Sequence, residues 1–132
     1  MAREGTTQVR VRYSEVDRMG VAHHRSHFVW FEMGRTEFLR GGGLPYAEVE
    51  AQGIFLPVIE ARCIYRAPAR YDDLLIVRTT LAEMGAVRAH FSYRIERESD
   101  GRLLATGSTT HAAVGAGGRP QRMPEALRRL FD

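Results

Sequence analysis

The strongest constraint on the fold of this chain is one long stretch of helical periodicity that ends at three glycines. Over residues 25–40, bulky apolar side chains recur at the spacing of one helix face. They are Phe28, Trp30, Phe31, Met33, Phe38 and Leu39. The run Gly41-Gly42-Gly43 then stops the pattern. About 16 residues give a helix of roughly 24 Å, whose apolar face must be covered by another layer that the rest of the chain supplies.

The remaining sequence mostly alternates between apolar and polar residues, as half-buried strands do. The predicted strands cover residues 7–13, 54–66, 73–83, 87–97 and 103–114, and short helices are predicted at 45–52 and 124–131. In the first strand Val9, Val11 and Tyr13 share one face, and Asp100-Gly101 is a hairpin turn between the last two strands. This order predicts an α+β fold in one domain over residues 1–132, with an antiparallel sheet wrapped around the long helix.

Gly34 lies inside the predicted long helix, where glycine costs ~1 kcal/mol relative to alanine. One interpretation is that a neighbouring element packs so closely that no Cβ fits there. The other is a tolerated defect, and the sequence leaves both open.

The basic residues exclude several classes of enzyme. The chain has 132 residues, and all 19 of its lysine-or-arginine positions are arginine. Without lysine there is no Schiff-base enzyme and no Walker-type phosphate loop, and without asparagine there is no catalytic triad that uses it. The arginines behind the net charge of +3 are scattered, so we expect no nucleic-acid binding. An anionic small molecule needs only two or three arginines and stays open.

Cysteine usage and the N-terminus indicate the cytoplasm. Cys63 is the single cysteine, so the chain forms no internal disulfide and no thiolate zinc site, which suits a reducing compartment. Residues 1–5 lack the apolar core of a signal peptide, and no apolar run approaches the ~20 residues of a membrane span. We therefore expect a cytoplasmic protein without a membrane span.

Polar residues that could carry chemistry gather in and just after the non-periodic loop at residues 14–24. They are Glu15, Asp17, His23, His24, His27 and Glu32. His23 and His27 are four residues apart and would share a helix face near Asp17, which allows a metal site, although no His-Glu-x-x-His signature is present. Alternatively, Asp17 could cap a turn before Gly20, a structural role that is common for aspartate.

A third interpretation of this loop is catalytic. A carboxylate in a glycine-containing loop that leads into a helix lies beside exposed backbone N–H groups. Those N–H groups and the helix dipole can polarise a carbonyl and stabilise the oxyanion that forms on it. Asp17 would be the general base or the nucleophile of such a site.

Three motifs resemble those of a known enzyme family. Residues 11–24, VRYSEVDRMGVAHH, resemble the active-site loop of the 4-hydroxybenzoyl-CoA thioesterase family, whose relatives include acyl-CoA thioesterases of the bacterial Tol-Pal gene cluster. Residues 31–40, FEMGRTEFLR, resemble its central helix, and residues 65–73, YRAPARYDD, resemble the segment between its second and third strands. The motifs occur in the family's order and spacing and span most of residues 8–115.

The resemblance implies a hotdog fold, in which a five-stranded antiparallel sheet wraps around one long central helix. It also implies a homodimer or homotetramer with active sites at the subunit interfaces. No metal or cofactor is expected, because coenzyme A is part of the substrate. In the family, the residue matching Asp17 is the catalytic carboxylate, and the backbone N–H at the position of His24 polarises the thioester carbonyl.

The chain departs from the family pattern at three positions. Val16 replaces a frequent threonine or cysteine, histidine at position 24 occurs in some branches only, and His27 stands where tyrosine is common. These departures leave the catalytic arrangement intact and the choice of acyl group open.

Coenzyme A carries several phosphates, and arginine is well suited to binding them. Arg66, Arg70 and Arg88 lie near predicted turns and are the candidates for these contacts. The alternative for each is a solvated arginine on a strand face or rim.

The resemblance therefore implies an acyl-CoA thioesterase that hydrolyses a small acyl-CoA to the free acid and CoA, and the loop residues are consistent with that chemistry. A hotdog hydratase or dehydratase is one alternative, although such enzymes usually pair an aspartate with a histidine and carry a different helix motif. A non-catalytic scaffold that binds acyl ligands or a protein partner is the other.

Overall fold

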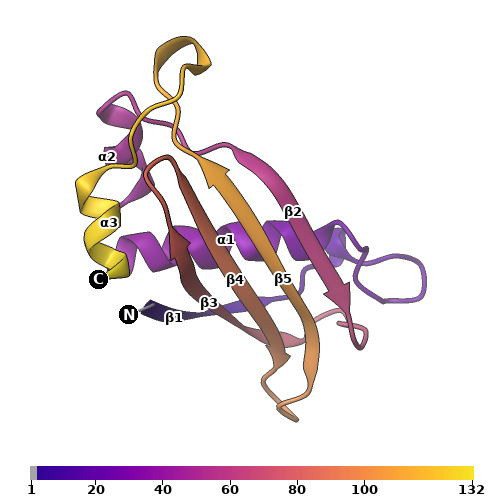
Figure 1. The fold of residues 1–132 in the computed structure, drawn as a ribbon. Coiled ribbons are helices and arrows are strands. Elements are labelled where there is room, and N and C mark those ends of the chain that lie inside the picture. The colour runs from indigo at the N-terminus through magenta and orange to yellow at the C-terminus, as the bar shows by residue number, and fades with distance from the viewer. Residues whose placement is uncertain (1–2) are drawn as a thin grey trace.

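Five antiparallel strands form one sheet in the computed structural model, which describes residues 3–132 (Figure 1). The strands are β1 (Arg3–Arg10), β2 (Val58–Tyr65), β3 (Leu74–Met84), β4 (Arg88–Arg97) and β5 (Leu103–Ala112). Their order across the sheet is β1-β3-β4-β5-β2, so β1 and β2 form its two edges. Every neighbouring pair is antiparallel, which confirms the predicted α+β fold with a five-stranded sheet.

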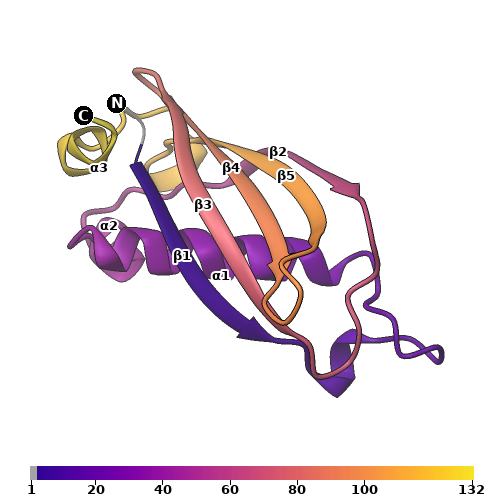
Figure 2. The ribbon, with the colours of Figure 1, turned by 90° about the horizontal axis from the view of Figure 1, so that it is seen from below.

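Three helices accompany the sheet: α1 (Ser26–Gly41), α2 (Tyr46–Ala51) and α3 (Glu125–Phe131). The expected single central helix is met only in part, because α1 is the longest at 16 residues but α3 also packs against β3. α1 lies along one face of the sheet and contacts β1, β2, β3 and β4 (Figure 2). Within residues 3–132, none of the helices combines the length and the apolar character needed to cross a bilayer.

The core lies between α1 and the face of the sheet that α1 covers. Trp30, Phe31 and Phe38 of α1 are buried there. Phe31 stacks on Tyr93 of β4 with their ring centroids 4.4 Å apart. Alternate residues of β3 and β4 are buried because successive side chains of a strand point to opposite faces. The apolar face of α1 and the apolar faces of β3 and β4 therefore pack together in one layer.

Gly34 lies where α1 approaches β3 closely. A Cβ built on Gly34 would lie 2.5 Å from Thr79 Oγ1 and 2.9 Å from Val77 Cγ1. Both separations are shorter than van der Waals contact, so a side chain here requires the helix or the strand to move. Close packing is therefore the correct interpretation of this glycine.

The first strand ends earlier than its alternating pattern predicts. β1 ends at Arg10, and a short 3-10 helix over Tyr13–Glu15 follows. Tyr13 is 78% exposed, so the prediction that it shares a buried face with Val9 and Val11 is wrong for Tyr13. The chain turns here because Glu15 Oε1 accepts a hydrogen bond of 2.8 Å from the backbone N–H of Arg12.

Strand β2 leaves one edge of the sheet open. Within the described part of the chain it pairs with β5 alone, and nearly all of its residues are exposed. Several of its exposed side chains are large and apolar: Val58, Ile59, Ile64 and Tyr65. An open edge that carries such residues favours pairing with another strand.

Candidate active site

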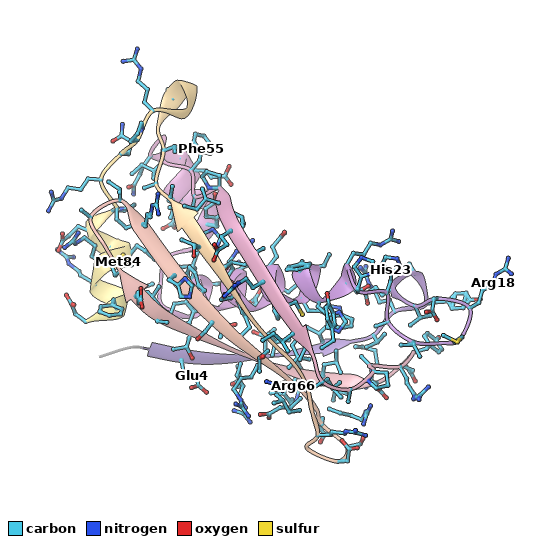
Figure 3. All side chains as sticks on the ribbon, turned by 45° about the vertical axis from the view of Figure 1, so that its right-hand side comes forward. Glu4, Arg18, His23, Phe55, Arg66 and Met84 are labelled. Atoms are coloured by element: carbon cyan, nitrogen blue, oxygen red, sulfur yellow. The ribbon has the colours of Figure 1, made fainter. Side chains whose placement is uncertain are left out.

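Asp17 lies in a turn that projects from one end of the molecule, with Arg18 near its tip (Figure 3). Its Oδ1 accepts hydrogen bonds from the N–H groups of Met19 at 2.8 Å and Val21 at 3.3 Å. Gly20 closes the turn with a φ of 74°. Asp17 therefore caps its turn, as the structural interpretation predicts. Its side chain is exposed, and Oδ2 makes no hydrogen bond with residues 3–132, so one carboxylate oxygen remains available for chemistry.

The backbone N–H of His24 lies just before α1 and has no acceptor among the described residues. Its neighbours are occupied, because the Arg25 N–H donates to His23 Nδ1 at 3.3 Å and the Ser26 N–H donates to the His23 carbonyl at 2.9 Å. Unpaired N–H groups at a helix N-terminus carry partial positive charge and bind anionic oxygen. An N–H group of this kind can stabilise an oxyanion if a substrate carbonyl is bound beside it.

Tyr65 contacts the backbone carbonyl group of His24. Its hydroxyl donates a hydrogen bond of 2.7 Å to the His24 carbonyl oxygen. Partial burial raises the pKa of Tyr65 to about 12, so the hydroxyl keeps the proton that it donates. The last residue of β2 therefore helps to fix the backbone from which the free N–H projects.

Glu15 is the buried carboxylate of this region, with 6% of its surface exposed. Besides the Arg12 N–H, it accepts a hydrogen bond of 3.0 Å from the indole N–H of Trp30 on α1. The Arg12 guanidinium lies 3.4 Å from the same Oε2 and balances its charge. The Glu15 backbone carbonyl accepts from the His23 N–H at 2.8 Å and from the Ser26 hydroxyl at 3.0 Å. Glu15 therefore connects the loop to the start of α1.

A groove of about 340 Å³ runs beside these groups. Val21 of the Asp17 turn, His24 and His27 line one part of it, and Tyr65 and Arg66 line another. Much of the lining is apolar, and the remaining residues come from the segment that follows β2. The groove therefore brings together the loop, the helix start and the end of β2, as an acyl-binding site would require.

His27 lines the groove but is almost fully buried, with 3% of its surface exposed. Its ring packs 4.8 Å from the ring of Trp30 and 4.7 Å from that of Tyr65. Burial lowers the pKa of His27, and the nearby backbone carbonyls of His23 and His24 oppose this shift only in part. His27 is therefore neutral near pH 7.

A second cavity of about 240 Å³ lies beside the C-terminal half of α1. Glu32 and Arg35 line it together with Tyr46 and His111. The sequence grouped Glu32 with the Asp17 loop, but Glu32 does not line the groove that contains His24 and His27. His27 and Glu32 both belong to α1, but they lie on different turns of the helix and line different cavities.

A buried hydrogen-bond network adjoins the second cavity. Sequence analysis did not predict it, because its members are only polar residues at strand positions. His111 bonds through Nδ1 to the Leu56 carbonyl at 2.9 Å and through Nε2 to Thr109 Oγ1 at 2.8 Å. Thr109 Oγ1 also lies 2.6 Å from the Tyr93 hydroxyl. Burial lowers the pKa of His111 to about 4, so this histidine is neutral over most of the pH range.

The three candidate arginines lie in different places. Arg66 lines the groove, and Arg70 pairs through its backbone with Val21 of the Asp17 turn. Arg88 begins β4 and pairs with Ala112, at the end of the sheet far from Arg66. Figure 3 shows Met84, which precedes Arg88 by four residues, at the opposite end of the sheet from Arg66. Of these three candidates, therefore, Arg66 and Arg70 lie near the proposed site within one chain and Arg88 does not.

The metal-site interpretation gains no support from the described residues. No group of three histidine, cysteine or carboxylate side chains within residues 3–132 is arranged to hold a metal ion. His23 instead accepts a hydrogen bond from the Arg25 N–H and stacks on His24 with ring centroids 4.3 Å apart.

Comparison with known proteins shows the family. Residues 11–131 match the thioesterase-like superfamily, which is nearly the whole chain. The chain belongs to this superfamily. The prediction of a thioester hydrolase from the sequence is thereby confirmed at the level of the family.

Individual relatives agree with this assignment. The chain is similar to a putative acyl-CoA thioesterase of Bacillus subtilis, YneP, with 29% identity over 81% of this chain and 77% of that protein. A solved structure of a hypothetical protein from Thermus thermophilus is 45% identical, with a TM-score of 0.90 over 98% of this chain and 99% of that one. The DHNA-CoA thioesterase of Staphylococcus aureus is 30% identical, with a TM-score of 0.90 over 96% of this chain and 90% of that one. The fold is therefore of the hotdog thioesterase type.

Proposed function

We propose that this protein hydrolyses a small acyl-CoA thioester to the free acid and coenzyme A. The observation that carries the proposal is one groove that is lined by His24, whose N–H has no acceptor among the described residues, and by Val21 of the turn that Asp17 caps with one carboxylate oxygen. Asp17 hydrogen-bonds to Val21, and Val21 lines the same groove as His24. The names of the Bacillus and Staphylococcus relatives, a putative acyl-CoA thioesterase and a DHNA-CoA thioesterase, support a CoA thioester as the substrate.

In the proposed reaction the thioester carbonyl oxygen accepts a hydrogen bond from the His24 N–H, and the dipole of α1 stabilises the oxyanion. Asp17 either takes a proton from water as the water attacks the carbonyl carbon, or attacks that carbon itself to form a mixed anhydride. In both routes the C–S bond breaks and CoA leaves as a thiolate. Water hydrolyses the anhydride in the second route. A thiolate is a good leaving group, so no metal or cofactor is needed.

The phosphates of CoA would be bound by arginine. Arg66 lines the groove, and Arg70 lies beside the Asp17 turn, so both can reach a ligand held in the groove. Arg88 belongs to the other end of the sheet and can contribute only from a second subunit.

We expect a homodimer or homotetramer, and the open edge of β2 supports this expectation. Antiparallel pairing of two β2 strands would satisfy both edges and cover exposed apolar residues such as Ile59 and Ile64. Because the strands run in opposite directions, the start of β2 in one subunit would lie near the end of β2 in the other. Each site would then combine Asp17 and His24 of one subunit with groove residues and Arg88 of its partner. We expect this assembly in the cytoplasm.

Replacement of Asp17 by asparagine tests the function. Asp17→Asn keeps an Oδ1 that caps the turn and removes the charge, so release of thiol from acetyl-, butanoyl- and benzoyl-CoA should fall at least ~10²-fold. Asp72→Asn is the matched control, since Asp72 is an exposed loop carboxylate. His24→Ala should cost much less than Asp17→Asn, because the proposed contact comes from the backbone.

An Asp17→Asn variant with near wild-type turnover would contradict the assignment. Loss of enoyl absorbance from an enoyl-CoA, without thiol release, would indicate a hydratase. Binding of acyl-CoA without any turnover would indicate a scaffold.

A further inference from the structure

Glu15 precedes Asp17 by two residues and contacts residues on both sides of His24, but it is neither the proposed carboxylate nor the proposed N–H donor. Its side chain and its backbone carbonyl together take part in five contacts, which involve Arg12, His23, Ser26 and Trp30. Asp17 follows Glu15 by two residues, while His23 and Ser26 flank His24 in sequence. We propose that Glu15 is a positioning residue that holds the Asp17 loop in register with the His24 N–H. The inference rests on the function proposed above.

The side chain fixes the loop to α1. Oε1 accepts from the Arg12 N–H at 2.8 Å, which closes the 3-10 turn before Asp17, and Oε2 accepts from the Trp30 indole at 3.0 Å. Trp30 has no exposed surface and belongs to the packed core, so the carboxylate ties the loop to a part of α1 that cannot shift freely. The loop is thereby docked to the helix that carries the partial positive charge.

The backbone carbonyl of Glu15 fixes the helix start. It accepts hydrogen bonds from the His23 N–H at 2.8 Å and the Ser26 hydroxyl at 3.0 Å. These donors come from both sides of His24, so the direction of the free N–H depends on the position of Glu15. A catalytic arrangement tolerates errors of only about 0.5 Å, and a displacement of about 1 Å can cost ~10²-fold in rate.

A carboxylate suits this position better than any neutral isostere. Both donors of its side chain are N–H groups, and a carboxylate offers an acceptor to each of them. Glutamine would face one N–H with an amide NH₂ and leave a buried donor without an acceptor. The Arg12 guanidinium supplies the counter-charge that a buried carboxylate needs.

The test compares Glu15→Gln and Trp30→Phe, alone and together, with the wild-type protein. Each single variant should lower kcat at least ~10-fold and leave KM within about threefold, because the change affects alignment rather than substrate binding. The kcat of the double variant should be within about twofold of the lower of the two single-variant kcat values. Both substitutions remove the same hydrogen bond, so their effects should not add. Glu37→Gln, an exposed carboxylate of α1, should keep the wild-type rate. Activity is measured well below the midpoint of unfolding of each variant.

Amide hydrogen exchange gives a readout that does not need activity. In Glu15→Gln, exchange should accelerate over residues 12–26 and stay unchanged in β3 and β4. Wild-type kcat in Glu15→Gln, full additivity of the two substitutions, or a uniform rise of exchange across the whole chain would each overturn the inference. Local exchange as expected in a protein that hydrolyses no acyl-CoA would instead overturn the proposed function and, with it, the catalytic role of Glu15.

Discussion

Gly34 offers a direct test of how closely α1 packs on the sheet. In Gly34→Ala the new Cβ would fall about 0.9 Å inside the ordinary contact limit with Thr79 Oγ1 and about 0.5 Å inside it with Val77 Cγ1. Both neighbours are buried and β-branched, so neither side chain can rotate away freely. Over-packing of this kind costs ~1–3 kcal/mol, and the better helix propensity of alanine returns up to ~1 kcal/mol. We expect a net loss of ~1–2 kcal/mol.

The assay is urea unfolding at one fixed protein concentration, with Gly41→Ala as the control. Gly41 ends the same helix, and a Cβ there would have no neighbour within 4 Å, so Gly41→Ala should be neutral or stabilising by up to ~1 kcal/mol. Adding Thr79→Ala to Gly34→Ala should recover part of the loss, since Thr79 Oγ1 has no hydrogen-bond partner in the described chain. A Gly34→Ala variant as stable as Gly41→Ala would refute the close packing.

Three other features give measurable outcomes. Because burial lowers the pKa of His111 from 6.5 to about 4, the unfolded chain takes up this proton first on acidification. The free energy of unfolding should therefore fall by up to ~3 kcal/mol as pH drops from 6.5 to about 4, and His111→Gln should flatten this dependence in urea titrations. Arg66→Ala should raise KM for acyl-CoA roughly 3- to 10-fold with kcat little changed, while Arg94→Ala on the outer strand face should alter neither constant. Light scattering of the active protein should give two or four times the chain mass of 14.9 kDa, and a fully active monomer would exclude a shared site.

The order and type of the main elements could be predicted because periodicity is a property of each segment. The helix predicted over residues 25–40 is observed at Ser26–Gly41, and the strand predicted at 87–97 is observed at Arg88–Arg97. The prediction for the first strand extends too far toward the C-terminus. The alternation of Val11 and Tyr13 continues past Arg10, where β1 ends before the turn that the Glu15 side chain stabilises. A local pattern cannot report a side-chain hydrogen bond that ends it.

The site could be predicted only in its outline. The sequence predicts Asp17 and His24 in one loop, and in the structure both lie in the segment between the 3-10 helix and α1. It gave no reason to expect a buried Glu15, because its partner Trp30 is 15 residues away and on a face that the sequence assigned to apolar contacts. It also placed Arg88 with Arg66 as one set. Strand alternation predicts which face of a sheet a residue lies on, but not how far it lies from a site. The strand pairing puts Arg88 at the end of the sheet opposite to the groove that Arg66 lines.

The hydrogen bond from Tyr65 to the His24 carbonyl joins the open edge of the sheet to the residue that offers the free N–H. In the proposed dimer, a partner strand paired with β2 would restrain Tyr65, and an acyl group bound at His24 would restrain the same short piece of backbone. If these two restraints favour the same backbone position, thermodynamic reciprocity makes each event favour the other by the same factor. Substrate would then tighten the assembly as much as assembly tightens substrate binding, and the abundance of the protein would itself set its specific activity.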